Sequence, residues 1–186
     1  MKKFISITTV LLVLLMGCSN DSNISSPIED QVKEPNWIAL PGHDIQSVEA
    51  DVSVSKMVIG SEETLLEINT GYAGGPHGWI SITANARFQR NSFTGQRYIT
   101  MTINDQFGTA TFSPSGTFLK PVIYNLTIMG VDLSNVDPTK VRFVYLAANG
   151  NYYTPQYESI YVEKQSGKLQ IVNARLPHFS RYGFVN

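Results

Sequence analysis

The chain has 186 residues, of which 42% are hydrophobic and 16% charged, with 14 Lys and Arg against 15 Asp and Glu. The near-neutral balance excludes the basic footprint of a nucleic-acid-binding protein, and the many aromatic residues exclude a chain that stays unfolded. A single cysteine excludes a disulfide within the chain, and three scattered histidines offer no cage for a metal ion. We therefore expect neither a metal nor a cofactor.

The N-terminus has the pattern of a secretory signal peptide. Lys2 and Lys3 precede the apolar run Phe4–Met16, which is too short to cross a bilayer as a helix. The run ends in Leu15-Met16-Gly17-Cys18, which resembles the bacterial lipobox, where a peptidase cuts before a lipid-modified cysteine. An ordinary signal peptide with an incidental cysteine is the alternative.

Cleavage before Cys18 implies a signal peptide over residues 1–17 and a mature chain held to the membrane by acyl chains on that cysteine. Loss of the two N-terminal lysines leaves 12 basic and 15 acidic residues, a net charge of −3. Ser19 follows the cysteine, and by analogy with enterobacterial sorting it favours the outer membrane. We expect the protein in the cell envelope, at the outer membrane or the cell surface.

Residues 18–50 predict a largely disordered, lipid-anchored tether. Ser19–Asn23 and Ser25–Pro27 contain polar turn formers without an apolar period, and such stretches bury too little surface to offset their ordering entropy. Trp37–Val48 contains a few apolar residues, and part of it is expected on the surface of the domain that follows, residues 51–186.

From Ala50 onward apolar residues recur at every second position, which is the period of a half-buried β-strand. Val141–Ala147 is apolar on nearly both faces and is expected to be a central strand. The expected strands are Leu65–Asn69, Trp79–Phe88, Arg97–Asn104, Thr109–Phe112, Val122–Met129, Val141–Ala147, Tyr157–Glu163, Leu169–Ala174 and Tyr182–Val185.

Turn residues separate these runs, and Asn149-Gly150 is the strongest hairpin signal among them. Leu133–Thr139 is the only helical-looking piece, and Pro138 limits it to about one turn. Eight to ten antiparallel strands, each with an apolar face, predict an all-β fold in which two sheets pack as a β-sandwich.

Three segments of the domain carry a family resemblance. They are Ala110–Val122, a turn followed by a strand that opens with Pro121, then Pro177–Tyr182, which reads PHFSRY, and Ser55–Gly60 followed by Leu65–Ile68. Together they resemble the ZU-five domain, a β-sandwich module of zonula-occludens, netrin-receptor and ankyrin proteins that also occurs in bacterial secreted proteins. The resemblance covers most of residues 51–186.

The resemblance also implies a reaction, because in some members of that family the chain breaks within a His-Phe-Ser motif without a protease. On an extended strand, His178 and Ser180 point to the same face. The imidazole would then act as general base for the Ser180 hydroxyl, which would attack the Phe179 carbonyl carbon. The acyl group would move from the Ser180 nitrogen to its oxygen as the peptide bond breaks, and water would split the resulting ester. The alternative is structural, with Phe179 and Tyr182 filling the two faces of the final strand.

Tyrosines provide a candidate ligand-binding surface. In Tyr157–Glu163, Ile160 and Val162 are expected to face the core, which places Tyr157 and Tyr161 outward. Tyrosine is also an ordinary strand residue, so this row has a structural alternative.

Other chemistry-bearing residues have simpler interpretations. The glycine-rich loop Gly71–Gly78 is expected to be a flexible connection, with a binding loop that uses His77 and Trp79 as the alternative. Asp132 and Asp137 match no calcium loop and are expected to make turn hydrogen bonds. His43, His77 and His178 are too dispersed to predict a catalytic triad.

The sequence favours a non-enzymatic, lipid-anchored β-sandwich that acts as an interaction or scaffold module. Its expected partners are the membrane, through lipidated Cys18, and a surface protein or glycan, without nucleic acid. A self-processing domain that cuts between Phe179 and Ser180 is the alternative.

Overall fold

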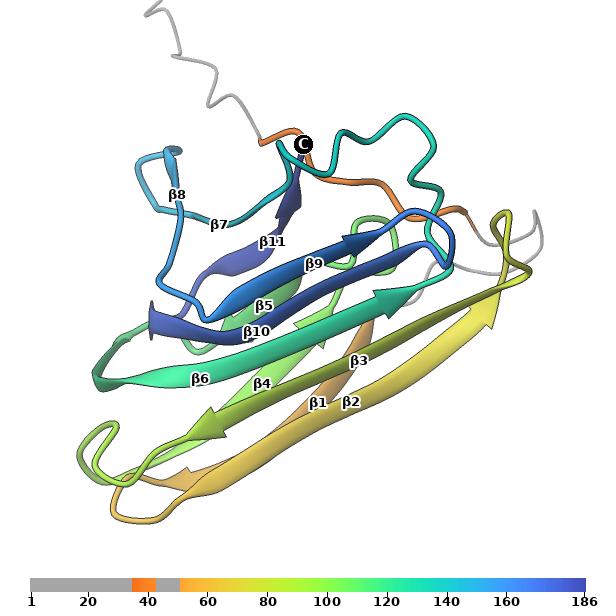
Figure 1. Cartoon of the computed structure of the whole chain (residues 1–186). Coiled ribbons are helices and arrows are strands. Elements are labelled where there is room, and N and C mark those ends of the chain that lie inside the picture. The colour runs from red at the N-terminus through yellow and green to blue at the C-terminus, as the bar shows by residue number, and fades with distance from the viewer. Residues whose placement is uncertain (1–34, 43–50) are drawn as a thin grey trace, which may run out of the picture. The chain divides into compact units, whose positions relative to one another are not determined.

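The computed structural model describes residues 35–42 and 51–186, which form β-strands, turns and loops (Figure 1). The predicted signal peptide, Cys18 and His43 lie outside the described residues. No helix in the described part of the chain is long and apolar enough to cross a membrane. The strands are β1 (Val52–Ile59), β2 (Thr64–Ala73), β3 (Trp79–Phe88), β4 (Gln96–Ile103), β5 (Ala110–Ser113), β6 (Thr117–Met129), β7 (Arg142–Leu146), β8 (Tyr152–Tyr153), β9 (Ser159–Glu163), β10 (Lys168–His178) and β11 (Arg181–Val185).

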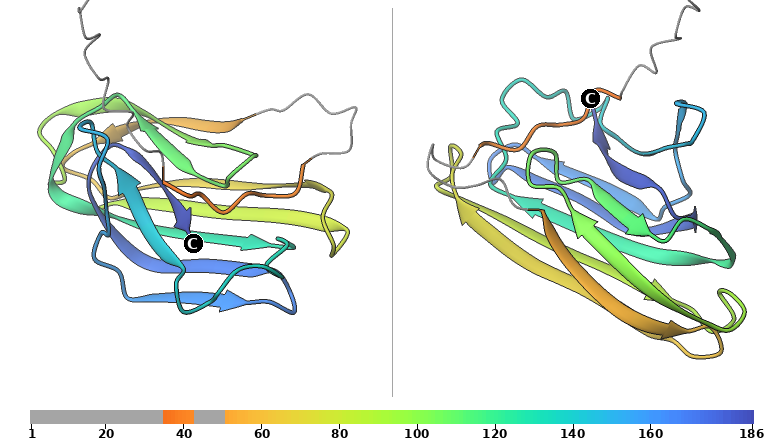
Figure 2. Two further views of the ribbon diagram at one scale, coloured as in Figure 1. Left: turned by 90° about the horizontal axis from the view of Figure 1, so that it is seen from above. Right: turned by 180° about the vertical axis from the view of Figure 1, so that it is seen from behind.

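The strands form two antiparallel sheets packed together, which confirms the predicted all-β sandwich (Figure 2). The six-stranded sheet has the order β1-β4-β5-β11-β7-β8, and the five-stranded sheet has the order β2-β3-β6-β10-β9. The pairs β2–β3, β4–β5, β7–β8 and β9–β10 are hairpins within one sheet. The remaining connections carry the chain from one sheet to the other.

Apolar side chains alternate into the space between the sheets, as the period of two predicts. The clearest strand is β3, whose even-numbered residues are buried while the odd-numbered ones face outward. The largest buried side chains of the core are aromatic, namely Phe88, Tyr124, Phe143, Tyr182 and Phe184. These rings pack edge-to-face or stacked against one another, which adds to the stabilisation from their buried area.

The predicted central strand Val141–Ala147 corresponds to β7, which is buried on both faces for two different reasons. Phe143 packs into the core between the sheets, whereas Val144 joins a small cluster with Trp37 and Val185 on the other face. β7 lies between β11 and the two-residue β8, so it is next to the edge of its sheet. The Asn149-Gly150 turn joins β7 to β8 as predicted, with Gly150 at a φ of 78°.

Three local predictions are wrong. Leu133–Thr139 makes consecutive turns in place of a helical turn, because Asp132 and Asp137 bind backbone N–H groups two residues ahead. Gly71 belongs to β2, so the connection between β2 and β3 is shorter than the predicted loop. Pro121 lies inside β6, at an interruption of its pairing with β10 where the ladder needs no N–H group.

Residues 35–42, the N-terminal latch, pack against the sandwich along the end of β11 (Figure 1). Trp37 bridges to Val185, and the Ile38 N–H donates to the Phe184 carbonyl oxygen at 2.9 Å. The latch thus extends the pairing of β11 beyond the short strand β5, which contacts only the first two residues of β11.

The latch is held by side chains as well as by backbone. Trp37, Ile38 and Leu40 are all buried, although the predicted tether extends to residue 50. The indole of Trp37 lies over Gly183, where an added Cβ would come within 3.1 Å of the ring. The Tyr72 hydroxyl donates to the Pro41 carbonyl oxygen at 2.8 Å, which fixes the other end of the latch to β2.

Candidate functional site

The His178-Phe179-Ser180 motif forms the corner where the chain leaves β10 and enters β11. β10 ends at His178 and β11 begins at Arg181, so the extended strand that would place His178 and Ser180 on one face is not present. The Ser180 hydroxyl donates to the Leu146 carbonyl oxygen. The Nδ1 atom of His178 lies 3.2 Å from the Phe179 carbonyl oxygen. The hydroxyl is therefore directed at β7 and not at the imidazole.

Aromatic packing and one strong hydrogen bond stabilise this corner. Phe179 is 8% exposed, and the centroid of its ring lies 4.5 Å from that of Phe118 and 5.8 Å from that of Phe112. The hydroxyl of the buried Tyr182 donates to the His178 carbonyl oxygen at 2.5 Å. A tyrosine that bonds back to the chain a few residues upstream is a recurrent stabiliser of corners in β-sandwiches. This geometry favours the structural interpretation of the motif.

The two tyrosines predicted to form an outward row lie in different environments. Tyr161 is on β9 and is 53% exposed, with the Lys168 ammonium 5.9 Å from its ring centroid. Tyr157 precedes β9 and is half-buried, because it packs against the core and also lines a groove on the outer face of the five-stranded sheet. The reason is local, because the segment before Ser159 is not part of the strand and does not keep its alternation.

The remaining predicted residues lie apart from these tyrosines. Trp79 is exposed at the start of β3, next to the connection that contains His77. The Asp132 carboxylate accepts a hydrogen bond from the Ser134 N–H at 3.0 Å, and hydrogen bonds from Ser134 lower its pKa. Asp137 makes the same turn with Thr139, as predicted. Within residues 35–42 and 51–186, no group of three His, Cys, Asp or Glu side chains is placed to hold a metal ion.

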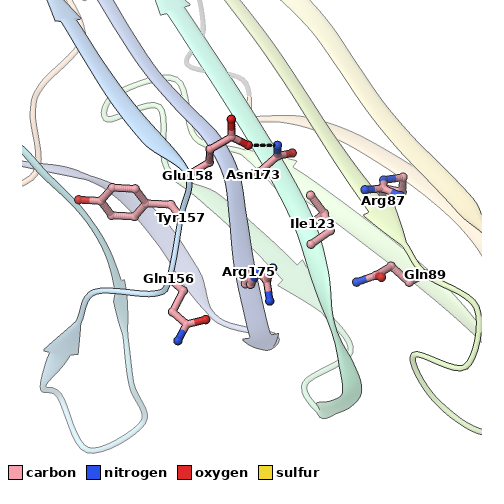
Figure 3. Close-up of a pocket in the computed structure, with 8 residues that line it drawn as sticks. All are labelled: Arg87, Gln89, Ile123, Gln156, Tyr157, Glu158, Asn173 and Arg175. Atoms are coloured by element: carbon pink, nitrogen blue, oxygen red, sulfur yellow. Dashed lines mark hydrogen bonds between the residues drawn. The ribbon is translucent and has the colours of Figure 1, made fainter.

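A groove of about 800 Å³ crosses the outer face of the five-stranded sheet (Figure 3). Its floor is a cross-strand row, in which Ile123 of β6 pairs with Arg87 of β3 on one side and with Arg175 of β10 on the other. Two strand spacings separate the arginine Cα atoms, which is about 10 Å. The rest of the lining consists of Gln89, Gln156, Tyr157, Glu158 and Asn173.

A β-bulge in β10 shapes one wall of the groove. The register of β10 against β6 shifts between Ile171 and Ala174, and Asn173 has a φ of 52°. Asparagine is one of the few residues that enter this left-handed region at low cost. The freed Asn173 N–H donates to the Asn125 side-chain oxygen at 2.8 Å, and Asn125 in turn donates to Asn85 at 3.0 Å.

The same bulge positions the segment before β9. The Asn173 side-chain amide donates to Glu158 at 2.6 Å, and the Arg175 N–H donates to the Gln156 carbonyl oxygen at 2.7 Å. Past the bulge, residues 156–158 therefore remain attached to β10 and form the outer rim of the groove (Figure 3). The bulge thus aims side chains that a regular strand would place elsewhere.

The charged side chains of the groove differ in how many hydrogen-bond and ion-pair partners they have. Glu158 is engaged by Asn173, and Arg87 lies 3.5 Å from Glu63 in a solvent-exposed ion pair, which contributes little to stability. Within the described part of the chain, the guanidinium of the exposed Arg175 has no hydrogen-bond or ion-pair partner. The groove is therefore a polar surface with a cation available for a ligand.

Of the residues that line this groove, sequence reasoning predicts only Tyr157 as a ligand-binding residue, although a further part of the signal is visible. The alternation in Trp79–Phe88 and Val122–Met129 places Arg87 and Ile123 on outward positions. Their neighbour Arg175 depends on the bulge, and a two-residue irregularity leaves no clear mark on the apolar period. The asparagines at 85, 125 and 173 are the remaining clue, because their alignment appears only once the strands are paired.

Comparisons of the chain with models of known protein families, with curated proteins and with solved structures find no match. The geometry of the groove and of the His178-Phe179-Ser180 corner is therefore the basis for the function proposed below.

Proposed function

We propose that the protein is a non-enzymatic, lipid-anchored module of the bacterial cell envelope that binds a polar partner through the groove on its five-stranded sheet. The observation that carries the proposal is the row Arg87–Ile123–Arg175, in which Arg175 lacks a partner among the described residues. A cation that a paired strand carries on the face of a sheet is available to bind an anionic or strongly polar group. The resemblance to the ZU-five domain belongs to the same proposal, and the two-sheet architecture is compatible with it.

The anchor rests on the lipobox-like segment Leu15–Cys18. When the gene is expressed in a bacterium that processes lipoproteins, we expect palmitate label in the wild type and none in Cys18→Ser, because only the thiol accepts the lipid. Intact-mass spectrometry under denaturing conditions is expected to give one acylated chain that runs from Cys18 to Asn186. Equal label in both proteins would refute the anchor, and a fragment that ends at Phe179 would show that the chain cuts itself.

The binding surface is tested with the unlipidated mature chain, residues 18–186 carrying Cys18→Ser, on envelopes isolated from the native cells. We expect Arg175→Gln to bind these envelopes about tenfold or more weakly, which corresponds to the loss of one charge-assisted hydrogen bond. Arg142→Gln is the matched control, since it removes the same charge from β7 in the other sheet. Unchanged binding of Arg175→Gln would show that the groove is not the binding surface.

A further inference from the structure

The position of the groove restricts how a ligand can be bound. Its floor is built from β3, β6 and β10. β3 and β6 are paired with a neighbouring strand on both sides, whereas β9 pairs with β10 only over Lys168–Val172, and at Arg175 an isolated bridge to Gln156 covers the outer side of β10. Their backbone N–H and C=O groups are therefore used within the sheet. A peptide that binds by adding a strand needs a free sheet edge, and this groove offers none. Recognition in the groove has to come from side chains.

The side chains of the groove are almost all planar and polar. Two guanidinium groups, the carboxylate of Glu158 and the amides of Gln89, Gln156 and Asn173 line it together with one aliphatic side chain, Ile123, and one aromatic side chain, Tyr157. Protein partners usually bind through a desolvated apolar or aromatic anchor, whereas most of the side chains that line this groove are polar. Amide and guanidinium groups instead present several donors and acceptors in fixed planes, and these match a ligand that is rich in hydroxyl groups.

The charge of the groove points to an acidic ligand. The lining holds two arginines and one carboxylate, Glu158, whose Oε2 atom already accepts a hydrogen bond from Asn173. Since the guanidinium of Arg175 has no partner among residues 35–42 and 51–186, it can form a bidentate pair with a carboxylate, which is the strongest geometry for this side chain. Arg87 can also pair with a carboxylate of the ligand, because it would give up only a solvent-exposed ion pair with Glu63.

We propose that the groove binds an acidic oligosaccharide, whose carboxylates pair with Arg87 and Arg175 and whose hydroxyl groups bond to the amides between and beside them. This inference rests on the proposed function and names the ligand class of the same groove. The separation of the arginine Cα atoms, about 10 Å, lets the two guanidinium groups contact different sugar units of one chain. Figure 3 shows the two arginines on opposite sides of Ile123.

The test measures binding of the unlipidated mature chain to hexagalacturonate, hexamannuronate and a hyaluronan hexasaccharide by isothermal titration calorimetry. The matched neutral probe is methyl-esterified hexagalacturonate, and a hexaglutamate peptide controls for charge without sugar. We expect at least one acidic sugar to bind, with affinity about tenfold or more higher than its neutral form and the peptide. Arg175→Gln is expected to lose most of this binding, whereas Arg142→Gln is expected to keep it.

The outcomes separate this inference from the proposed function. Equal binding of the acid and its methyl ester, or preferential binding of the peptide, would overturn the ligand class. Binding of no acidic sugar, while envelope binding still depends on Arg175, would also overturn the ligand class and leave the groove as the binding surface. Envelope binding that does not depend on Arg175 would refute the groove itself, and with it both proposals.

Discussion

Replacement of Phe179 by alanine is expected to lower the free energy of unfolding by about 3–5 kcal/mol, the usual cost of removing a large ring from a packed core. The ring closes the corner between β10 and β11 and contacts the rings of Phe88, Phe112 and Phe118. Its removal leaves a cavity between two sheets whose paired strands cannot collapse inward freely. Urea denaturation followed by circular dichroism measures the loss.

Leu119→Ala provides the control for Phe179→Ala, since Leu119 lies on β6 close to Phe118 in the chain but is 74% exposed. Its stability is expected to stay within about 0.5 kcal/mol of the wild type. A loss of less than 1 kcal/mol for Phe179→Ala would contradict the structural role of the His178-Phe179-Ser180 corner. It would favour the alternative, in which the chain cuts itself between Phe179 and Ser180.

Replacement of Trp37 by alanine is expected to lower the free energy of unfolding by about 3 kcal/mol, at the lower end for a buried tryptophan. The indole is 7% exposed and covers Gly183, while it also packs against Val144 and Val185. The lower end is expected because the latch lies at the border of the fold and its neighbours can relax.

Trp79 offers a matched control, because it is the other tryptophan of the chain and is 56% exposed. Trp79→Ala is expected to change stability far less than Trp37→Ala under the same denaturation conditions. A loss of stability for Trp37→Ala as small as that for Trp79→Ala would mean that the latch adds nothing to the stability of the sandwich. Hydrogen exchange at the Ile38 and Leu40 amides would locate the change, since both donate to carbonyl groups of the domain.

The strands were predictable wherever one face is apolar and the other polar. In β3, β4 and β6 the alternation is unbroken over most of the strand, and the structure buries the predicted side. A slip of one residue would expose that whole apolar side, so the register of such strands is strongly determined. The two-sheet architecture follows from many strands of this kind.

The sequence could not predict features that depend on contacts far along the chain. The latch has too few apolar residues to show a period, and Trp37 finds its partners about 150 residues later, at the end of β11. The alternation of β9 does not determine the environment of Tyr157, which lies two residues before the strand begins and contacts both the core and the groove. The groove depends on the bulge at Asn173, which changes where Arg175 and residues 156–158 lie.

From its contacts we expect the latch to affect how the domain responds to mechanical load. A pull on the N-terminal side of Pro35 reaches the Trp37–Val185 bridge and the Ile38–Phe184 hydrogen bond before it reaches β1. These bonds lie one after another along the latch, so they would break singly and at lower force than a whole sheet. Release of residues 35–42 would add about 25 Å of chain, while β11 would stay paired with β7. Under load, the latch would thus detach before the strands of the sandwich separate.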